Sequence, residues 1–87
     1  MTDESIPTIS DEAAQTTVLE AFRHVLGIAE VDPQAPFGAL GGDSLRAVRV
    51  LSRVWRELGV ELPVHALRDT TTAAEFAAVV RERSGTP

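Results

Sequence analysis

The 87-residue chain contains no cysteine. This absence excludes a disulfide framework, a thiol nucleophile and any metal site built on thiolates. No apolar run approaches the ~18 residues that span a bilayer, and nothing resembles a signal peptide. Positive charge is scarce, with 8 Lys and Arg against 13 Asp and Glu and a net charge of −5. Because nucleic-acid-binding domains are usually basic, we expect a small, soluble, cytoplasmic protein that binds neither nucleic acid nor membrane.

The length limits how the chain is organised. A chain of this size forms one domain with a thin core, and most enzyme folds with a closed active-site pocket need more residues. Hydrophobic residues at 44% and charged residues at 24% are ordinary globular values. The polar, aperiodic ends predict flexible tails at residues 1–9 and 84–87. The folded domain is therefore expected over residues 10–83, as a monomer.

The first helix is indicated at both of its ends. Ser10 is a favoured N-cap residue, Asp11 and Glu12 follow in the first turn, and Gly27 is a typical C-terminal stop. The apolar residues between these ends keep a three- and four-residue spacing that forms one buried stripe. They are Ala14, Val18, Phe22, Val25 and Leu26.

A loop and a second helix follow. Proline and glycine are frequent over residues 28–42, which predicts a long ordered loop held to the core by Val31, Phe37 and Leu40. The second helix is expected to begin at Asp43 and Ser44 and to end at Leu58, before Gly59. Its projection at ~100° per residue separates an apolar arc from a basic one. The apolar arc holds Val48, Val50, Leu51, Val54, Trp55 and Leu58, and the basic arc holds Arg46, Arg49, Arg53 and Arg56.

Two further elements complete the chain. Residues 63–68 fit one short helical turn. Thr72, with Glu75 three residues later, forms a capping box that begins a last helix. Its apolar face holds Phe76, Val79 and Val80. Since no segment has a strand pattern, the sequence predicts an all-α fold, a small bundle of three main helices and one short helix.

One segment, LGGDSL at residues 40–45, combines a turn with two adjacent helix-capping residues. The two glycines permit positive φ, and either Asp43 or Ser44 would be enough to cap the helix. If Asp43 is the cap, the hydroxyl of Ser44 is free at the first helical position. Free N–H groups and the helix dipole favour an anion there, so this hydroxyl is well placed to carry a phosphodiester. A plain turn and cap is the alternative interpretation.

These residues resemble the signature of the phosphopantetheine-carrying proteins, the acyl and peptidyl carriers of fatty acid, polyketide and nonribosomal peptide synthesis. The pattern Gly-Gly-(Asp/His)-Ser-(Leu/Ile) is present at residues 41–45. RAVR at residues 46–49 is similar to the peptidyl-carrier form of the second helix. GVELP at residues 59–63 and TAAEFA at residues 72–77 are similar to the segments that follow. The resemblance covers roughly residues 11–83, and it implies an acyl-carrier-protein-like fold.

By this resemblance Ser44 would carry 4′-phosphopantetheine, donated from coenzyme A by a phosphopantetheinyl transferase, with Gly42 and Asp43 beside the attachment point. The thiol of the arm would hold an amino acyl or peptidyl group as a thioester. The chain would have no catalytic residue and no metal. It would present its cargo to adenylation, condensation, thioesterase or tailoring enzymes. The residues expected to contact such partners are Leu45, Arg46, Val48 and Arg49.

The sequence departs from the family pattern at two places. Gly38 stands where many peptidyl carriers have a second aromatic residue, and Arg68 and Thr71 replace a common phenylalanine and proline before the last helix. Fatty-acid carriers typically have acidic residues along the second helix, whereas this chain has arginines. The resemblance therefore favours a peptidyl carrier, with a polyketide acyl carrier as the alternative. A free-standing carrier and an excised synthetase domain would look the same.

A different class of protein shares part of the motif. The string GDSL at residues 42–45 is also the hallmark of the GDSL esterases, whose serine is a nucleophile. Those enzymes are much longer α/β proteins and need a downstream Asp-x-x-His pair to activate the serine. His65 is the only histidine after Ser44, and Leu62 stands where the aspartate is needed. These features argue against an esterase.

A pure interaction module is a third possibility. The second helix carries four arginines and one glutamate, so its charge is +3 while the rest of the chain sums to −8. This arginine stripe is either a solvated helix face or a surface for an acidic partner. His24 and His65 have no second ligand at metal spacing and are interpreted as ordinary residues. Trp55 is predicted to lie in the core and to meet Val60 across the helix stop.

Overall fold

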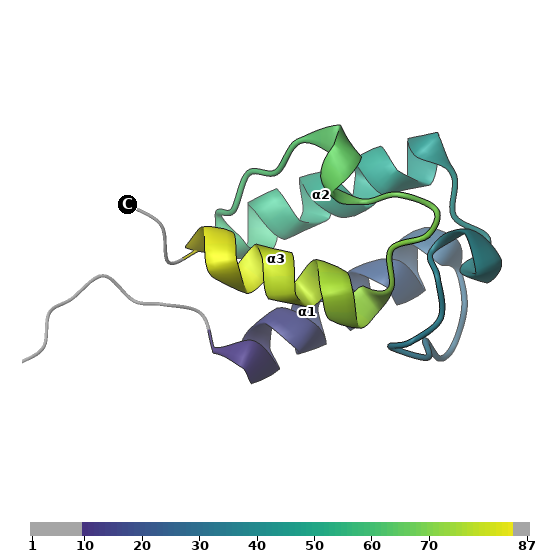
Figure 1. Ribbon diagram of the computed structural model, residues 1–87, viewed down its shortest axis with the longest axis horizontal. Helices are drawn as coiled ribbons and strands as arrows, with labels where there is room; N and C mark the ends of the chain where they lie inside the picture. Colours follow the sequence, from purple (N-terminus) through teal and green to yellow (C-terminus); the bar gives the residue numbers. More distant parts are fainter. Residues whose placement is uncertain (1–9, 85–87) are drawn as a thin grey trace, which may run out of the picture.

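The computed structural model describes residues 10–84, so the predicted N-terminal tail (residues 1–9) and residues 85–87 of the predicted C-terminal tail (84–87) lie outside the described residues. Three α-helices form the described chain: α1 (Asp11–Leu26), α2 (Ser44–Leu58) and α3 (Ala73–Ser84) (Figure 1). Two short 3₁₀ turns accompany them, η1 (Gly38–Leu40) and η2 (Val64–Ala66). Residues 10–84 contain no strand beyond an isolated bridge between Pro36 and Thr72. The predicted all-α fold with one short helical turn before the last helix is confirmed.

The first two helices begin and end where the sequence predicts. The hydroxyl of Ser10 accepts a hydrogen bond from the N–H of Ala13 at 3.1 Å, so it satisfies one of the free donors at the start of α1. Gly27 is the C-cap of α1 and Gly59 is the C-cap of α2, and both glycines have positive φ. These ends were predictable because helix caps are made by residues close in sequence.

The last helix starts with the predicted reciprocal cap. Thr72 Oγ1 accepts from the N–H of Glu75 at 3.1 Å, and Glu75 Oε1 accepts from the N–H of Thr72 at 3.0 Å. The helix runs to Ser84, one residue beyond the predicted end of the folded domain. The extra residue is held because the Ser84 hydroxyl donates to the carbonyl of Arg81 at 2.7 Å, and Arg81 pairs with Asp11 at the start of α1.

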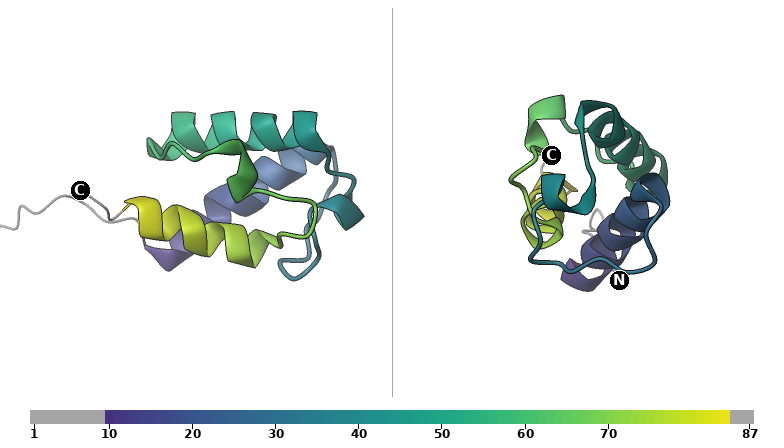
Figure 2. Two further views of the ribbon diagram at one scale, coloured as in Figure 1. Left: turned by 45° about the horizontal axis from the view of Figure 1, so that its top comes forward. Right: turned by 90° about the vertical axis from the view of Figure 1, so that its right-hand side faces the viewer.

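The first helix packs against both of the others, α2 and α3. The end-on view in Figure 2 shows the three helices surrounding a common centre, and the turn η2 lies between α2 and α3. The start of α1 and the end of α3 lie at the same end of the molecule (Figure 1). None of the helices in residues 10–84 is long and apolar enough to cross a membrane.

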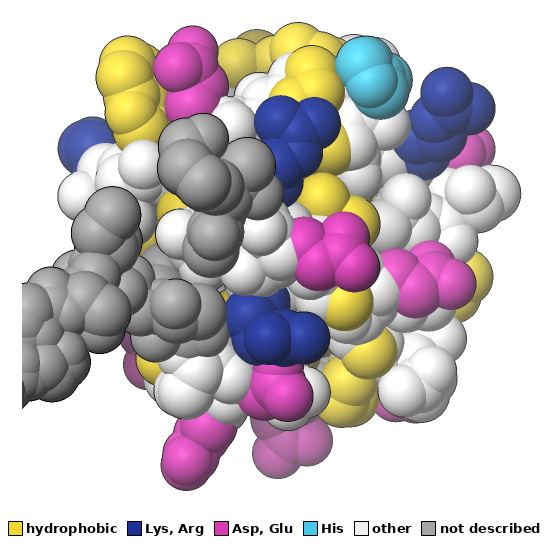
Figure 3. All heavy atoms as spheres, turned by 60° about the vertical axis from the view of Figure 1, so that its left-hand side comes forward, with side chains coloured by type: hydrophobic (Ala, Val, Ile, Leu, Met, Phe, Trp, Pro, Cys, Tyr) yellow, Lys and Arg dark blue, Asp and Glu magenta, His cyan; other side chains and the backbone are white. Residues whose placement is uncertain are grey.

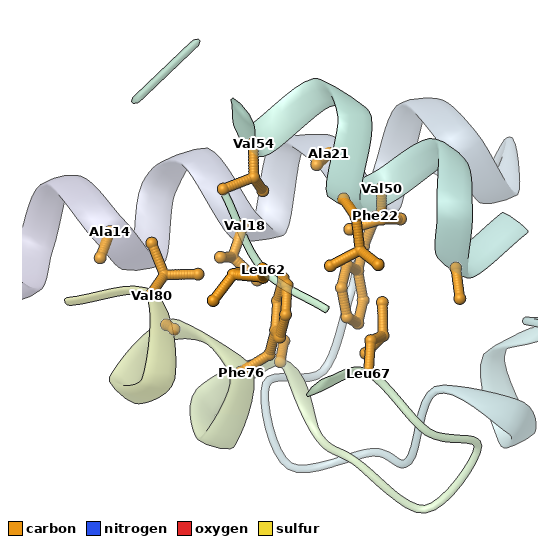
Figure 4. Packing of buried hydrophobic residues seen from close by; sticks show 14 of the residues in the cluster. Ala14, Val18, Ala21, Phe22, Val50, Val54, Leu62, Leu67, Phe76 and Val80 are labelled. Atoms are coloured by element: carbon orange, nitrogen blue, oxygen red, sulfur yellow. The ribbon is translucent and has the colours of Figure 1, made fainter. Parts of the chain in front are cut away.

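Three phenylalanines from separate segments form the middle of the core. The ring of Phe22 in α1 lies edge-on to that of Phe37, with centroids 5.1 Å apart, and 6.3 Å from that of Phe76 in α3. Aromatic pairs at such distances add attraction beyond their burial. The apolar side chains around them point toward one another from the three helices and from the segment between α2 and α3 (Figure 4). They include Ala14, Val18, Ala21, Val50, Val54, Leu62, Leu67 and Val80.

The segment between α1 and α2 is held to the chain just before α3. The N–H of Phe37 donates to the carbonyl of Thr71, and the N–H of Gly38 donates to that of Asp69, each at 2.8 Å. Phe37 is buried, while Val31 and Leu40 are partly buried against the core, as predicted. The turn η1 was not predicted, and the residues at its start are held by this pairing with a distant segment.

The predicted burial of Trp55 is wrong, since 55% of its surface is exposed. The buried stripe of α2 consists of Ala47, Val50, Leu51 and Val54. At ~100° per residue, Trp55 and Val48 lie about 80–100° around the helix from Ala47, at the edge of this stripe. Val60, beyond the helix stop, is buried at 6% exposure.

Candidate functional site

Asp43 and Ser44 occupy different positions at the start of α2. Asp43 is the N-cap, with its Oδ1 accepting from the N–H of Arg46 at 2.9 Å and its Oδ2 accepting from Arg46 Nη1 at 2.9 Å. Ser44 is the first helical residue and is exposed. Its hydroxyl forms no hydrogen bond with any residue between 10 and 84. The arrangement predicted for these two residues, a cap followed by a free hydroxyl, is present.

The cap also sets the charge of the site. The hydrogen bond from the Arg46 N–H, together with the positive charges of Arg46 and Arg49, holds the pKa of Asp43 below its usual value. Partial loss of solvation raises the pKa of Asp43, but the net shift is still downward. Asp43 is therefore ionised at neutral pH and retains its capping role, which leaves the Ser44 hydroxyl available for other chemistry.

The two glycines before the cap serve different purposes. Gly41 has φ of +98°, a left-handed conformation that favours glycine, and its N–H donates to the carbonyl of Gly38 at 3.1 Å. Gly42 does not have positive φ. A Cβ at Gly42 would lie 2.3 Å from the ring of Phe37, which is far inside contact distance. Glycine is thus required at Gly42 because the Phe37 ring packs directly against the backbone that leads into α2.

A hollow of about 510 Å³ adjoins Ser44. Phe37 and Ala47 contribute buried side chains to its wall, and the segment from η2 onward supplies the other side. The full lining is Phe37, Gly42, Asp43, Ser44, Ala47, Val64, His65, Leu67, Arg68 and Asp69. The sequence did not predict this hollow, because residues 64–69, which are distant from Ser44 in the chain, form one side of it. The only sequence signal at this place was Arg68, which replaces a phenylalanine that is common in the family.

The residues expected to contact partners lie on the surface of α2 next to Ser44. All four are exposed: Leu45, Arg46, Val48 and Arg49. Leu45 and Val48 leave 61% and 43% of their surface in solvent, although both are apolar. The structure thus places an apolar pair beside two basic side chains, one of which is already paired with Asp43.

The geometry required of a serine hydrolase is not formed. Among residues 10–84 no hydrogen bond joins His65 to Ser44 or to a carboxylate, although both residues line the same hollow. A nucleophilic serine needs such a base, itself oriented by a third group. The described chain also has no group of three or more His, Cys, Asp or Glu side chains that could hold a metal ion.

The sequence matches a known family, described as "Phosphopantetheine attachment site", over residues 16–80. It is also 36% identical over 67 residues to surfactin synthase subunit 3 of Bacillus subtilis (strain 168). That match covers 77% of this chain but 5% of the relative, so the chain spans a small part of the curated relatives it matches. The chain belongs to the phosphopantetheine attachment site family.

Solved carrier structures have the same fold. BlmI, a type-II acyl-carrier-protein from Streptomyces verticillus involved in bleomycin biosynthesis, superposes with a TM-score of 0.77 at 29% identity. The match covers 83% of this chain and 87% of BlmI. A peptidyl carrier protein in complex with the transferase Sfp and coenzyme A gives a TM-score of 0.75 at 30% identity, covering 92% and 100% of the two chains. The predicted carrier fold is confirmed.

Proposed function

We propose that Ser44 carries 4′-phosphopantetheine and that the thiol of this arm holds an amino acyl or peptidyl group in nonribosomal peptide synthesis. The observation that carries the proposal is the exposed Ser44 hydroxyl, which is free because Asp43 already caps α2. The residue lies inside the segment that matches the phosphopantetheine family. The arm supplies a thioester-forming thiol, which this cysteine-free chain does not itself contain.

Modification at Ser44 joins its Oγ to the phosphorus of the pantetheine phosphate of coenzyme A. The Oγ proton is lost, and the adenosine bisphosphate portion of coenzyme A leaves. The product is a phosphodiester that carries a negative charge at the N-terminus of α2. Free N–H groups and the helix dipole stabilise such a charge. The reaction belongs to a phosphopantetheinyl transferase, so we assign no catalytic residue to the carrier.

The partners follow from this role. The transferase Sfp, which binds a similar carrier, represents the first class of partner. Adenylation, condensation, thioesterase and tailoring enzymes form the second class. We assign their contacts to Leu45, Arg46, Val48 and Arg49, since an apolar pair with a charged rim suits a weak, transient interface. The carrier acts as a monomer in the cytoplasm.

A polyketide acyl carrier is the second candidate, and the likeness to BlmI, an acyl-carrier-protein, supports it. The four arginines of α2 favour the peptidyl type. Loading assays separate the two: a peptidyl carrier accepts amino acids from adenylation enzymes, and a polyketide carrier accepts malonyl-type groups from acyltransferases.

Intact mass tests the attachment site. Native protein, Ser44→Ala and Ser52→Ala are incubated with coenzyme A and a broad-specificity transferase. Ser52 is a matched control because it is an exposed serine on the same helix. We expect one phosphopantetheine on the native protein and on Ser52→Ala, and none on Ser44→Ala. Ser44→Ala should retain its helical circular dichroism because Asp43 still caps α2. Modification of Ser44→Ala as complete as that of the native protein contradicts the assignment.

A further inference from the structure

The hollow beside Ser44 has a lining of mixed character. Its inner wall is apolar, formed by Phe37, Ala47 and Leu67, which are all buried. The outer rim holds charged side chains, including Arg68 and Asp69. Because Ser44 itself belongs to the lining, any group attached to its hydroxyl begins at the edge of this hollow.

Arg68 has a fixed backbone and an unpaired side chain. Its N–H donates to Thr71 Oγ1 at 3.0 Å, which holds the chain at this point. Its guanidinium, in contrast, forms no ion pair or hydrogen bond with residues 10–84, although Asp69 is next in sequence. Arg46 and Arg53 on α2 each pair with a carboxylate close in sequence, Asp43 and Glu57 respectively. An exposed guanidinium without a partner is available to an anion, and it binds phosphate oxygens in a planar, bidentate manner.

Val64 is the second unexplained residue of the lining. It is an apolar side chain with 58% of its surface exposed, and it belongs to the turn η2, which precedes Arg68 in the chain. An apolar side chain and a free cation in the lining of one hollow suit a ligand that has both an apolar group and an anionic group. Phosphopantetheine has this order, since the carbon chain after its phosphate carries two methyl groups.

We propose that, when no partner enzyme holds it, the arm lies in this hollow, with Arg68 pairing the phosphodiester and Val64 contacting the two methyl groups. The proposal rests on Ser44 being the attachment point. The carboxylate of Asp43, which precedes Ser44, already accepts two hydrogen bonds from Arg46, so it is partly neutralised. Asp69 is the competing anion for Arg68, but no ion pair joins the two side chains in the described chain, residues 10–84.

The test compares unmodified and modified protein by nuclear magnetic resonance. Arg68→Gln removes the charge and keeps the backbone N–H, whereas Arg68→Lys restores a charge without the planar fork. Arg56→Gln is the matched control, because it lies 12 residues beyond Ser44 on α2, or about 18 Å along the helix axis. Intact mass is recorded first, so that each sample is known to carry the arm.

We expect the Nε–H signal of Arg68 to shift on modification and that of Arg56 to stay in place. The ³¹P signal of the phosphodiester should move in Arg68→Gln, remain native in Arg56→Gln and be partly restored in Arg68→Lys. About 1 M salt, with a Debye length of ~3 Å, should reduce the difference. Nuclear Overhauser contacts should join the methyl groups of Val64 to those of the arm.

Two negative results have different meanings. If the native protein gains mass but the Arg68 signal, the ³¹P signal and the Val64 contacts do not respond, the arm is free in solvent and this inference is wrong. If the native protein gains no mass, the proposed attachment at Ser44 is itself wrong.

Discussion

Asp43 and Ser44 are adjacent residues with similar capping propensity, yet only one of them caps α2. The carboxylate of Asp43 takes both the backbone N–H and the side chain of Arg46. At a helix N-terminus a carboxylate accepts the capping hydrogen bond, and its negative charge is also stabilised by the helix dipole. A hydroxyl can accept the hydrogen bond but has no charge for the dipole to stabilise. The division of roles between the two residues therefore follows from charge, and it leaves Ser44 free for modification.

The lowered pKa of Asp43 predicts a pH dependence of stability. A carboxyl whose folded pKa lies below its unfolded value, near 3.9, stabilises the fold above that value and loses the contribution as pH falls through the folded pKa. Asp43→Asn keeps a capping oxygen but removes the charge. We expect the native protein to melt higher than Asp43→Asn above about pH 5, with the difference closing below about pH 4. A difference that stays constant from pH 7 to pH 3 would contradict a charged cap.

The contact between Gly42 and Phe37 gives a second prediction at this scale. Gly42→Ala introduces a Cβ that overlaps the Phe37 ring, so we expect a loss of about 1–3 kcal/mol in the free energy of unfolding. Chemical denaturation measures it. Phe37→Leu makes room for the methyl group, and Gly42→Ala should cost less in that background. Equal costs in both backgrounds would mean that the ring is not the cause.

At the scale of the element, the sequence predicted what local chemistry decides. The starts of α1, α2 and α3 depend on caps within four residues, and the sequence predicted them at Ser10, at the pair Asp43 and Ser44, and at Thr72. Trp55 and η1 were missed because their surroundings come from distant segments. A helical projection orders the residues of α2 around its axis but does not say how far its neighbours extend over the apolar arc.

The capping box of α3 is testable by a single substitution. Thr72→Ala removes the acceptor for the N–H of Glu75 and should lower stability by about 0.5–2 kcal/mol. A domain of this size loses about 4–8 °C in melting temperature for each kcal/mol. Thr72→Ser keeps the hydroxyl and is the control. Equal melting of the alanine and serine variants would show that the side-chain hydroxyl contributes nothing to the cap.

The partner contacts proposed for α2 predict an effect of charge on the rate of loading. Arg49→Glu reverses a charge next to Leu45 and Val48, while Arg56→Glu makes the same change about two turns further along the helix. Arg46 is less suitable because it also pairs with Asp43. We expect Arg49→Glu to slow loading by the cognate adenylation enzyme more than Arg56→Glu does, with unchanged circular dichroism.

Salt and transferase choice provide the controls for that comparison. Loading of the native protein should weaken as salt rises, because exposed charges are screened within about 10 Å at 0.1 M. A transferase that prefers an acidic second helix should modify Arg49→Glu faster than the native protein. If both proteins load equally and neither responds to salt, the arginine stripe is only a solvated helix face.

For the molecule as a whole, charge is distributed unevenly. The face in Figure 3 shows basic and acidic side chains close together, with apolar patches between them. A hollow of about 330 Å³ between the end of α1 and α2 has basic side chains and no carboxylate in its lining. The basic residues and the histidine are His24, Arg49, Arg53 and Arg56. An acidic chain thus presents a positive region on the helix that begins at Ser44, which suits recognition of acidic partner surfaces.

The most direct measurement locates the arm on the chain by tryptic mapping of the modified protein. The chain has five serines and no lysine, so trypsin cuts only after arginine. The peptide of residues 24–46 contains Ser44 as its single serine and no threonine. We predict that this peptide alone gains the mass of one phosphopantetheine and that fragmentation assigns it to Ser44. Phosphopantetheine on a peptide that contains Ser10, Ser52 or Ser84 would contradict the assignment.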